Sequence, residues 1–212
     1  MILDRGHPGA IARRGAESLV TLKSLVLWAS PPVDVREIAA REFIARFAAH
    51  WLSLPRPGGA ISPTLASYLD HADPVVQPSV ALVDVTADRR LMVRLFATRR
   101  EAGFGRNVTG TDALSVYPPE IRGRIWTGVR AVVDHPCGLL TSRIVTSASG
   151  VSTEYLSLTL PIALPENGPK CVANCIASVG RPPDEPHVAR VSSVGPGSWV
   201  DIGAGVPKGE NM

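Results

Sequence analysis

The sequence has few cysteines, and their number is odd. Three cysteines in 212 residues do not form the paired framework of a secreted disulfide-rich domain, so we expect a reducing, cytoplasmic environment. Cys171 and Cys175 lie four positions apart in a predicted strand, where that spacing covers about 13 Å. This distance is too long for one disulfide or one shared zinc ion. The cysteines are therefore predicted to be small core residues.

Lysine is scarce, and the overall charge is close to balanced. The chain has 22 basic and 19 acidic residues, which gives a net charge of +3. A charge this small, spread over the whole chain, produces a weak field, so we predict no nucleic-acid partner. A local group of arginines between residues 89 and 106 is interpreted as a solvated face.

No membrane-spanning segment is predicted. The apolar stretch at residues 19–29 is interrupted by Lys23 and is about half as long as a membrane helix needs to be. Arginines precede it, as in a signal peptide, but Trp28 stands where a small-residue cleavage pattern is required. We interpret residues 1–33 as an N-terminal extension, poorly ordered or forming a short helix, and predict no membrane partner.

Common catalytic signatures are absent. The chain has no G-x-S-x-G elbow, no P-loop, no H-E-x-x-H and no dinucleotide fingerprint. His71 with Asp73, and Asp134 with His135, offer acid and base groups, but proximity in sequence is a poor ground for a catalytic pair. We predict that the protein is not an enzyme, with a small enzyme of unknown reaction as an alternative.

The chain does contain enough apolar sequence for one folded domain. Its length and its hydrophobic fraction of 45% suit a single core. Ile44, Phe47 and Trp51 recur at helical spacing and predict a helix over residues 35–54. A second helix is predicted to begin at residues 118–119, where two prolines suit a first turn, and to end before Pro136.

Five segments have the composition of β-strands: residues 80–85, 91–97, 138–148, 153–164 and 171–179. In residues 153–164, Leu156, Leu158 and Leu160 alternate with other residues, so the leucines are expected to face inward beneath helices. Residues 181–212 hold five prolines and five glycines and predict a flexible tail. The predicted fold class is α+β, with a five-stranded antiparallel sheet covered by helices.

The order of these elements, with several local motifs, resembles a family of PAS-like proteins common in alphaproteobacteria. The shared features are Trp51 with Leu54-Pro55, strands at residues 82–85 and 93–95, and the sequence Gly105-Arg106-Asn107-Val108-Thr109-Gly110, which matches G-R-[DN]-x-T-G. The resemblance covers about residues 44–178. It implies that residues 34–180 form a standalone PAS-like sensory or regulatory domain, which binds a small molecule or a partner protein.

Flavin and haem are two cofactors found in PAS domains. The flavin-adduct subgroup carries a reactive cysteine directly after G-R-N, whereas this chain has Val108 there. Some PAS domains bind haem through a histidine on their longest helix, and His135 stands at the end of the corresponding helix. Its place before Pro136 favours a helix cap instead. The resemblance therefore leaves the cofactor unknown.

A cavity is expected where the short, glycine-interrupted helices meet the curved sheet. Phe104, Trp126, Val129 and Leu158 are predicted to face this cavity, either as ligand-binding residues or as plain core. A protein-interaction scaffold, whose cavity is filled by side chains, is the alternative to a sensor.

The N-terminal helix is the predicted contact with other proteins. Phe43, Phe47 and Trp51 give helix 35–54 a broad aromatic face. This face predicts a homodimer or the binding of an effector protein.

Overall fold

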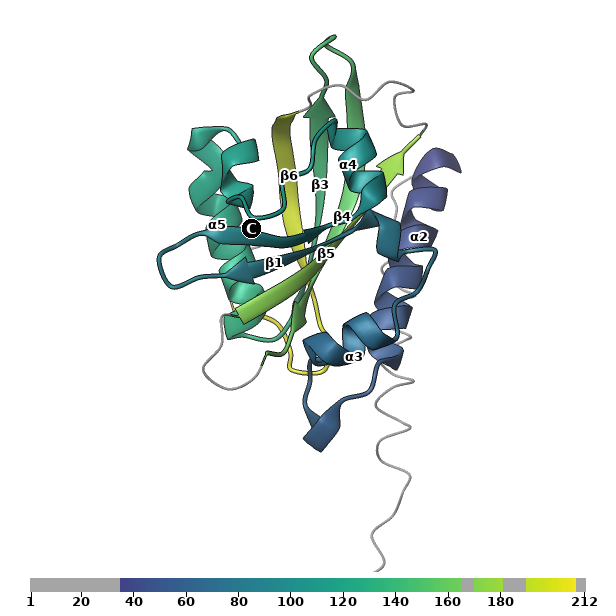
Figure 1. Ribbon diagram of the computed structural model, residues 1–212, viewed down its shortest axis with the longest axis vertical. Coiled ribbons are helices and arrows are strands. Elements are labelled where there is room, and N and C mark those ends of the chain that lie inside the picture. The colour runs from purple at the N-terminus through teal and green to yellow at the C-terminus, as the bar shows by residue number, and fades with distance from the viewer. Residues whose placement is uncertain (1–34, 165–169, 181–189, 209–212) are drawn as a thin grey trace, which may run out of the picture.

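A six-stranded antiparallel sheet forms the centre of the computed structural model (Figure 1). The structure describes residues 35–164, 170–180 and 190–208. The strands follow the order β2-β1-β5-β4-β3-β6, and each neighbouring pair is antiparallel. Their bounds are β1 Val80–Val85, β2 Leu91–Phe96, β3 Gly138–Thr146, β4 Ser152–Ile162, β5 Lys170–Val179 and β6 Arg190–Val200.

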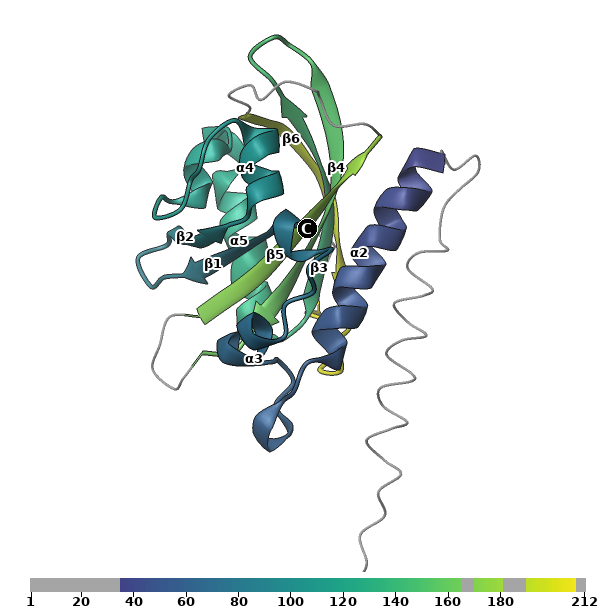
Figure 2. The same cartoon turned by 45° about the vertical axis from the view of Figure 1, so that its right-hand side comes forward.

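Helix α2 (Val35–Ser53) packs against one face of this sheet, over β4 and β5 (Figure 2). Phe47 and Trp51 are fully buried there, and the Trp51 Nε1 donates a hydrogen bond to the Pro161 carbonyl at 3.0 Å. Leu158 and Leu160 of β4 lie in the same hydrophobic cluster. This apolar contact supplies much of the folding free energy of that layer.

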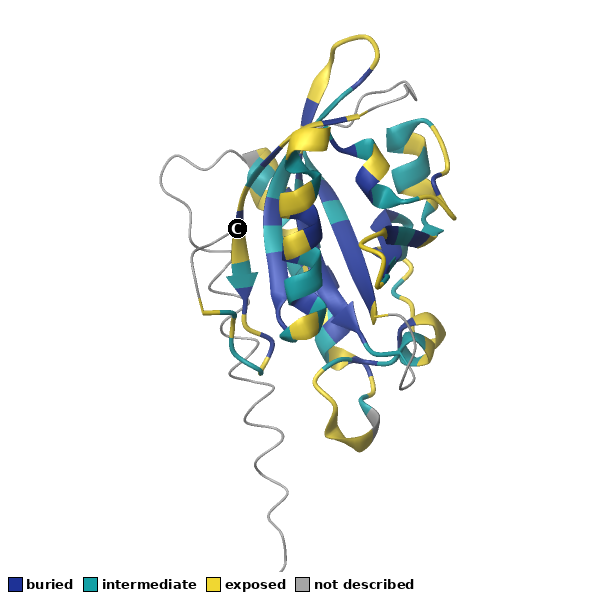
Figure 3. Ribbon diagram, turned by 90° about the vertical axis from the view of Figure 1, so that its left-hand side faces the viewer, coloured by how far each residue is buried: buried dark blue, intermediate teal, exposed yellow. Residues whose placement is uncertain are grey.

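The opposite face of the sheet is covered by α4 (Thr98–Phe104), the short helix η3 (Ala113–Val116) and α5 (Pro119–Asp134). Ile125, Trp126 and Val132 of α5 are buried, and exposed residues lie on the outer side of the helix (Figure 3). The remaining helices are η1 Pro57–Gly59, α3 Leu65–Asp70 and η2 Gln77–Ser79. No helix in the described ranges has the length and apolarity to cross a bilayer.

The sequence correctly predicted the α+β class, the antiparallel sheet and the N-terminal helix, but it missed one strand. The prediction of a flexible tail from residue 181 onwards was wrong for residues 190–200, which form β6 and pair with β3. The glycine and proline content was misleading because β6 is an edge strand, where Pro196 loses no ladder bond. A Cβ on Gly195 would lie 2.5 Å from the Ser142 Oγ, so a larger residue there would have to displace the Ser142 hydroxyl.

Parts of the predicted tails fall outside the described residues. These are the whole predicted extension, residues 1–33, the first residue of the predicted domain, Asp34, and residues 181–189 and 209–212 of the predicted tail.

Both faces of β4 are buried, so its alternating leucine and polar side chains do not mark a buried and an exposed side. Leu158 and Leu160 face α2. Ser157 and Thr159, which alternate with these leucines, are also shielded from solvent because α4 and α5 cover their side. The strand therefore separates two interiors, one apolar and one that contains polar groups.

Candidate ligand cavity

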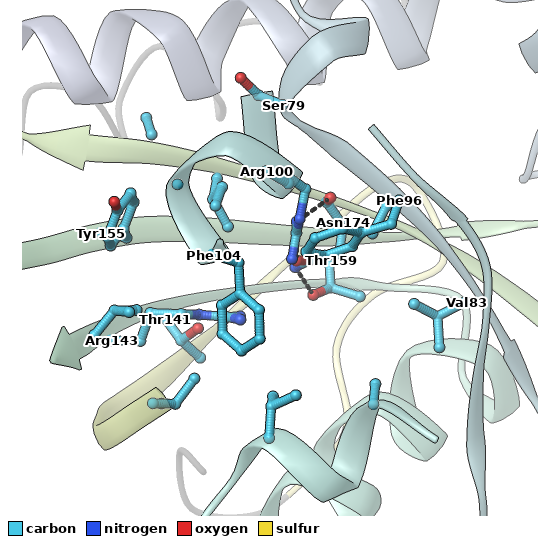
Figure 4. Close-up of a pocket in the computed structure, with 18 of the residues that line it drawn as sticks. Ser79, Val83, Phe96, Arg100, Phe104, Thr141, Arg143, Tyr155, Thr159 and Asn174 are labelled. Atoms are coloured by element: carbon cyan, nitrogen blue, oxygen red, sulfur yellow. Dashed lines mark hydrogen bonds between the residues drawn. The ribbon is translucent and has the colours of Figure 1, made fainter. Parts of the chain in front are cut away.

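A cavity of about 610 Å³ lies between the sheet and its cover of α4, η3 and α5 (Figure 4). Apolar side chains from both layers form most of its wall, among them Val83, Leu91, Val93, Phe96, Phe104, Ile125, Val129, Leu139 and Val172. Phe43 of α2 also lines it, as do Ser178 and Gly180 at the end of β5. A volume of this size accommodates a small organic molecule.

Polar side chains of three adjacent strands form the floor of the cavity. Thr141 and Arg143 come from β3, Tyr155 and Thr159 from β4, and Asn174 from β5. They share one face because each strand places every second side chain on the same side.

Asn174 is the centre of a hydrogen-bond network that joins the helical cover to the sheet. Its Nδ2 donates to the Ser157 Oγ at 2.8 Å and to the Thr159 Oγ1 at 2.9 Å. From α4, the Arg100 Nη1 donates to the Asn174 backbone oxygen at 2.9 Å and to its Oδ1 at 2.8 Å. The amide of Asn174 thus uses both of its donors and its acceptor inside the protein.

Arg143 extends the network along the floor. Its Nη2 donates to the Ser157 Oγ at 2.6 Å, and its Nη1 donates to the Tyr117 hydroxyl at 2.9 Å. Ser157 therefore accepts from both Arg143 and Asn174, and this chain of contacts links the guanidinium groups of Arg143 and Arg100.

The cavity has a positive electrostatic character. Among the residues that the structure describes, its lining includes Arg99, Arg100 and Arg143 but no aspartate or glutamate. Within the described part of the chain, neither Arg100 nor Arg143 forms an ion pair, and the Nε of each is buried without a hydrogen-bond partner. Burial, followed by repulsion from Arg143, lowers the pKa of Arg100 to about 10, so this guanidinium stays charged at neutral pH.

The G-R-N-V-T-G sequence holds the end of α4 against β2. Gly105 ends the helix in the left-handed region at φ 75°, which glycine adopts without strain. The Asn107 Oδ1 accepts from the Thr109 N–H at 2.8 Å, and the Gly110 N–H donates to the Val93 carbonyl at 2.7 Å. Val108 is buried and lines the cavity.

Two of the four predicted cavity residues line the cavity, and two do not. Phe104 and Val129 line the cavity, whereas Trp126 and Leu158 are not part of its wall. Trp126 packs in the apolar core around α5. The placement of Leu158 was wrong because its side of β4 faces α2.

The polar residues of the site were missed in the sequence. Arg100 was assigned to a solvated arginine face, yet its Nε is sealed from solvent. Arg143 and Asn174 stand inside predicted strands, and a polar side chain in an otherwise apolar strand was the signal that could have revealed them.

The candidate acid and base residues lie away from the cavity. Asp73 pairs with Arg46, with 2.8 Å between the Arg46 Nε and the Asp73 Oδ2, and the His71 Nδ1 contacts the Ser67 carbonyl at 2.9 Å. Neither His71 nor His135 belongs to the cavity wall.

The second candidate pair is engaged in the same way. Asp134 pairs with Arg130 and Lys170. Among the residues that the structure describes, no three histidine, cysteine, aspartate or glutamate side chains are placed to hold a metal ion.

No protein-family profile and no curated protein sequence matches this chain. Solved structures do resemble it. The LOV protein of Rhodobacter sphaeroides is 14% identical over 48% of this chain, with a TM-score of 0.39. A PAS domain from Colwellia psychrerythraea is 13% identical over 46% of this chain and 84% of its own, with a TM-score of 0.36.

An RNA-binding Light-Oxygen-Voltage receptor is 13% identical over 80% of this chain and 52% of its own, with a TM-score of 0.41. All three are PAS or LOV domains. The match spans 59% of the Rhodobacter sphaeroides chain. These similarities concern the arrangement of helices and strands.

Proposed function

We propose that this chain is a PAS-like sensory or regulatory domain that binds a small organic molecule in the cavity and signals by contact with another protein. The observation that carries the proposal is the buried, donor-rich floor of a cavity of about 610 Å³. Protein cores are close-packed, and their polar groups are satisfied. A large cavity whose arginine Nε atoms have no partner fits a binding site better than a filled core.

Helix α4 is the element that we propose reports on the ligand. It has seven residues, none of them buried, so few apolar contacts hold it in place. It also carries Arg100 and Phe104, which both line the cavity. A ligand that contacts these side chains would change the position or the order of α4, because weakly packed elements open at low cost in free energy.

The aromatic face of α2 is not the proposed partner surface. Phe47 and Trp51 pack against this chain's own sheet, and Phe43 lines the cavity. A homodimer or effector contact through α2 would use its outer side, where Ile38 is 42% exposed and Glu42 is also exposed.

The proposal includes a reducing cellular compartment and no catalytic activity. Cys137, Cys171 and Cys175 are free and buried, as expected of a chain that does not depend on disulfides. The small net charge favours neither a nucleic acid nor an anionic membrane as a partner.

Native mass spectrometry of gently purified protein, followed by an NMR screen of small molecules, tests this proposal. We expect a retained or newly bound molecule in the wild type and none in Ala81→Phe. Ala81 of β1 lines the cavity, so the larger side chain would occupy it. A clean apo mass with no binding in the screen would support the scaffold alternative, and equal binding by Ala81→Phe would place the site elsewhere.

A further inference from the structure

We infer that the cavity selects an organic anion, a carboxylate on an alkyl or aryl body, with its head group at Arg100 and Arg143. This inference rests on the proposed function, since it names the chemical class of the ligand in the same cavity.

The described lining of the cavity has positive charge without a negative counterpart. Arg100 and Arg143 bring two guanidinium groups to one cavity, and none of the described residues that line it carries a carboxylate. A buried charge is costly unless a counter-charge and hydrogen bonds compensate for it. Across residues 35–164, 170–180 and 190–208 the two groups have only neutral partners: Asn174, Ser157 and Tyr117. A carboxylate from solution would supply the missing charge.

One edge of the Arg100 guanidinium, formed by its Nε and Nη2, lacks a hydrogen-bond acceptor from the residues whose structure is described. Arg100 uses only its Nη1 toward Asn174, so its Nε and Nη2 have no acceptor among the described residues. Elsewhere in this chain, Arg46 holds Asp73 by that same edge, from Nε at 2.8 Å and from Nη2 at 3.1 Å. The open edge of Arg100 has the planar, two-donor geometry that a carboxylate accepts.

The aromatic cover connects the binding of an anion to α4. The Arg100 guanidinium lies 5.2 Å from the centre of the Phe96 ring, and Phe96 meets Phe104 edge-on, with 6.2 Å between ring centres. The Nε of Arg100 is sealed from solvent. A head group therefore reaches that atom only when the cover over Arg100 shifts, and Phe104 is the last residue of α4.

The apolar wall defines the rest of the ligand. Beyond the polar floor, the lining is aliphatic and aromatic, with residues such as Val93, Ile125 and Leu139. Such a wall favours a hydrocarbon body. A sugar or a nucleotide would leave many of its polar groups unpaired there.

Matched probes with one hydrocarbon body test the inference on the wild-type protein. Titration calorimetry at pH 7.5 would compare octanoate with octanol and octylamine, and 3-phenylpropionate with 3-phenylpropanol and 3-phenylpropylamine. We expect each carboxylate to bind about tenfold to a hundredfold more tightly than its alcohol, the gain that hydrogen bonds to charged groups provide. The amines should bind most weakly.

The outcomes separate this inference from the proposed function. If an alcohol or amine binds as tightly as the carboxylate, the anion inference fails while the ligand cavity stands. If no probe of either body binds, the proposed function fails with it.

Single charge removals identify the residues. Arg100→Gln and Arg143→Gln should each lower the affinity for octanoate at least about tenfold. Each should change the affinity for octanol by less than about twofold. Arg89→Gln, which removes the same charge from the exposed turn between β1 and β2, should leave both unchanged. If all three variants lowered the affinity for octanoate equally, the loss of one positive charge would explain the effect wherever it occurs, and the assignment of Arg100 and Arg143 would be overturned. Urea unfolding confirms that each variant is folded, and the wild-type probe series decides the question if one is not.

Discussion

Arg100 of α4 donates two hydrogen bonds to Asn174 of β5, one to the backbone oxygen at 2.9 Å and one to the side-chain Oδ1 at 2.8 Å. This pair connects the helical cover to the floor of the cavity. It also orients the amide of Asn174, whose two N–H groups then point to Ser157 and Thr159. A single buried amide therefore organises both the polar floor and the attachment of α4.

The first prediction concerns the stability that Asn174 provides. Asn174→Leu should lower the free energy of unfolding by about 2–4 kcal/mol, because it leaves Arg100, Ser157 and Thr159 without a shared partner. Urea unfolding followed by circular dichroism measures this loss. Thr141→Val is the matched control, since the Thr141 hydroxyl has no hydrogen bond to the described residues, and it should cost less than about 1 kcal/mol. Equal costs for the two variants would contradict the central role of Asn174.

The second prediction concerns the attachment of β6. A Cβ on Gly138 would lie 2.9 Å from the Cβ of Val200 and 3.0 Å from the Cδ2 of Leu160, so Gly138→Ala should destabilise the protein by about 1–3 kcal/mol. Gly123→Ala, in α5 with no atom near the added Cβ, should stabilise it by about 0.5–1 kcal/mol. Thermal unfolding of the two variants gives opposite shifts if β6 packs as described. A neutral Gly138→Ala would mean that β6 is not held against β3.

The third prediction concerns thiol reactivity. Burial raises the pKa of Cys137 to about 11, and the pKa values of Cys171 and Cys175 to about 12, from 9.0. At pH 8 the thiolate fraction is therefore very small. We expect Ellman's reagent to label no thiol quickly in the folded protein and three per chain in urea. Rapid labelling of the folded protein would contradict the burial of these cysteines.

The same pKa values fix the sign of an alkaline effect on stability. The folded protein keeps these thiol protons at a pH at which the unfolded chain has lost them. Their contribution to the free energy of unfolding is thus complete below pH 9 and is lost as the pH rises toward 11–12. Urea unfolding at a series of alkaline pH values should show this decline.

The sequence could predict elements whose periodicity was unbroken. Trp51 and Phe47 marked α2, and the leucines of β4 marked a buried strand. β6 was missed because Gly195, Pro196 and Gly197 resemble a linker, and only the pairing with β3 shows that an edge strand tolerates them. Long-range pairing of this kind leaves little local signal.

The sequence predicted where the cavity lies but not which polar groups line it. Phe104 and Val129 were placed correctly in its wall, although their contact with a ligand stays a prediction. The error with Leu158 came from assuming that only one face of β4 is buried. The decisive polar groups, Arg100 and Asn174, lie 74 residues apart, so only the folded chain brings them together.

The most direct test is a two-dimensional ¹H–¹⁵N NMR titration of the wild-type protein with octanoate, read at three side-chain N–H groups. We predict that the Nε–H signals of Arg100 and Arg143 shift with one saturating curve. The indole N–H of Trp51, bonded to Pro161 on the other face of the sheet, should not move. Unchanged arginine signals at saturating octanoate, or a shift confined to Trp51, would contradict a ligand site on the polar face.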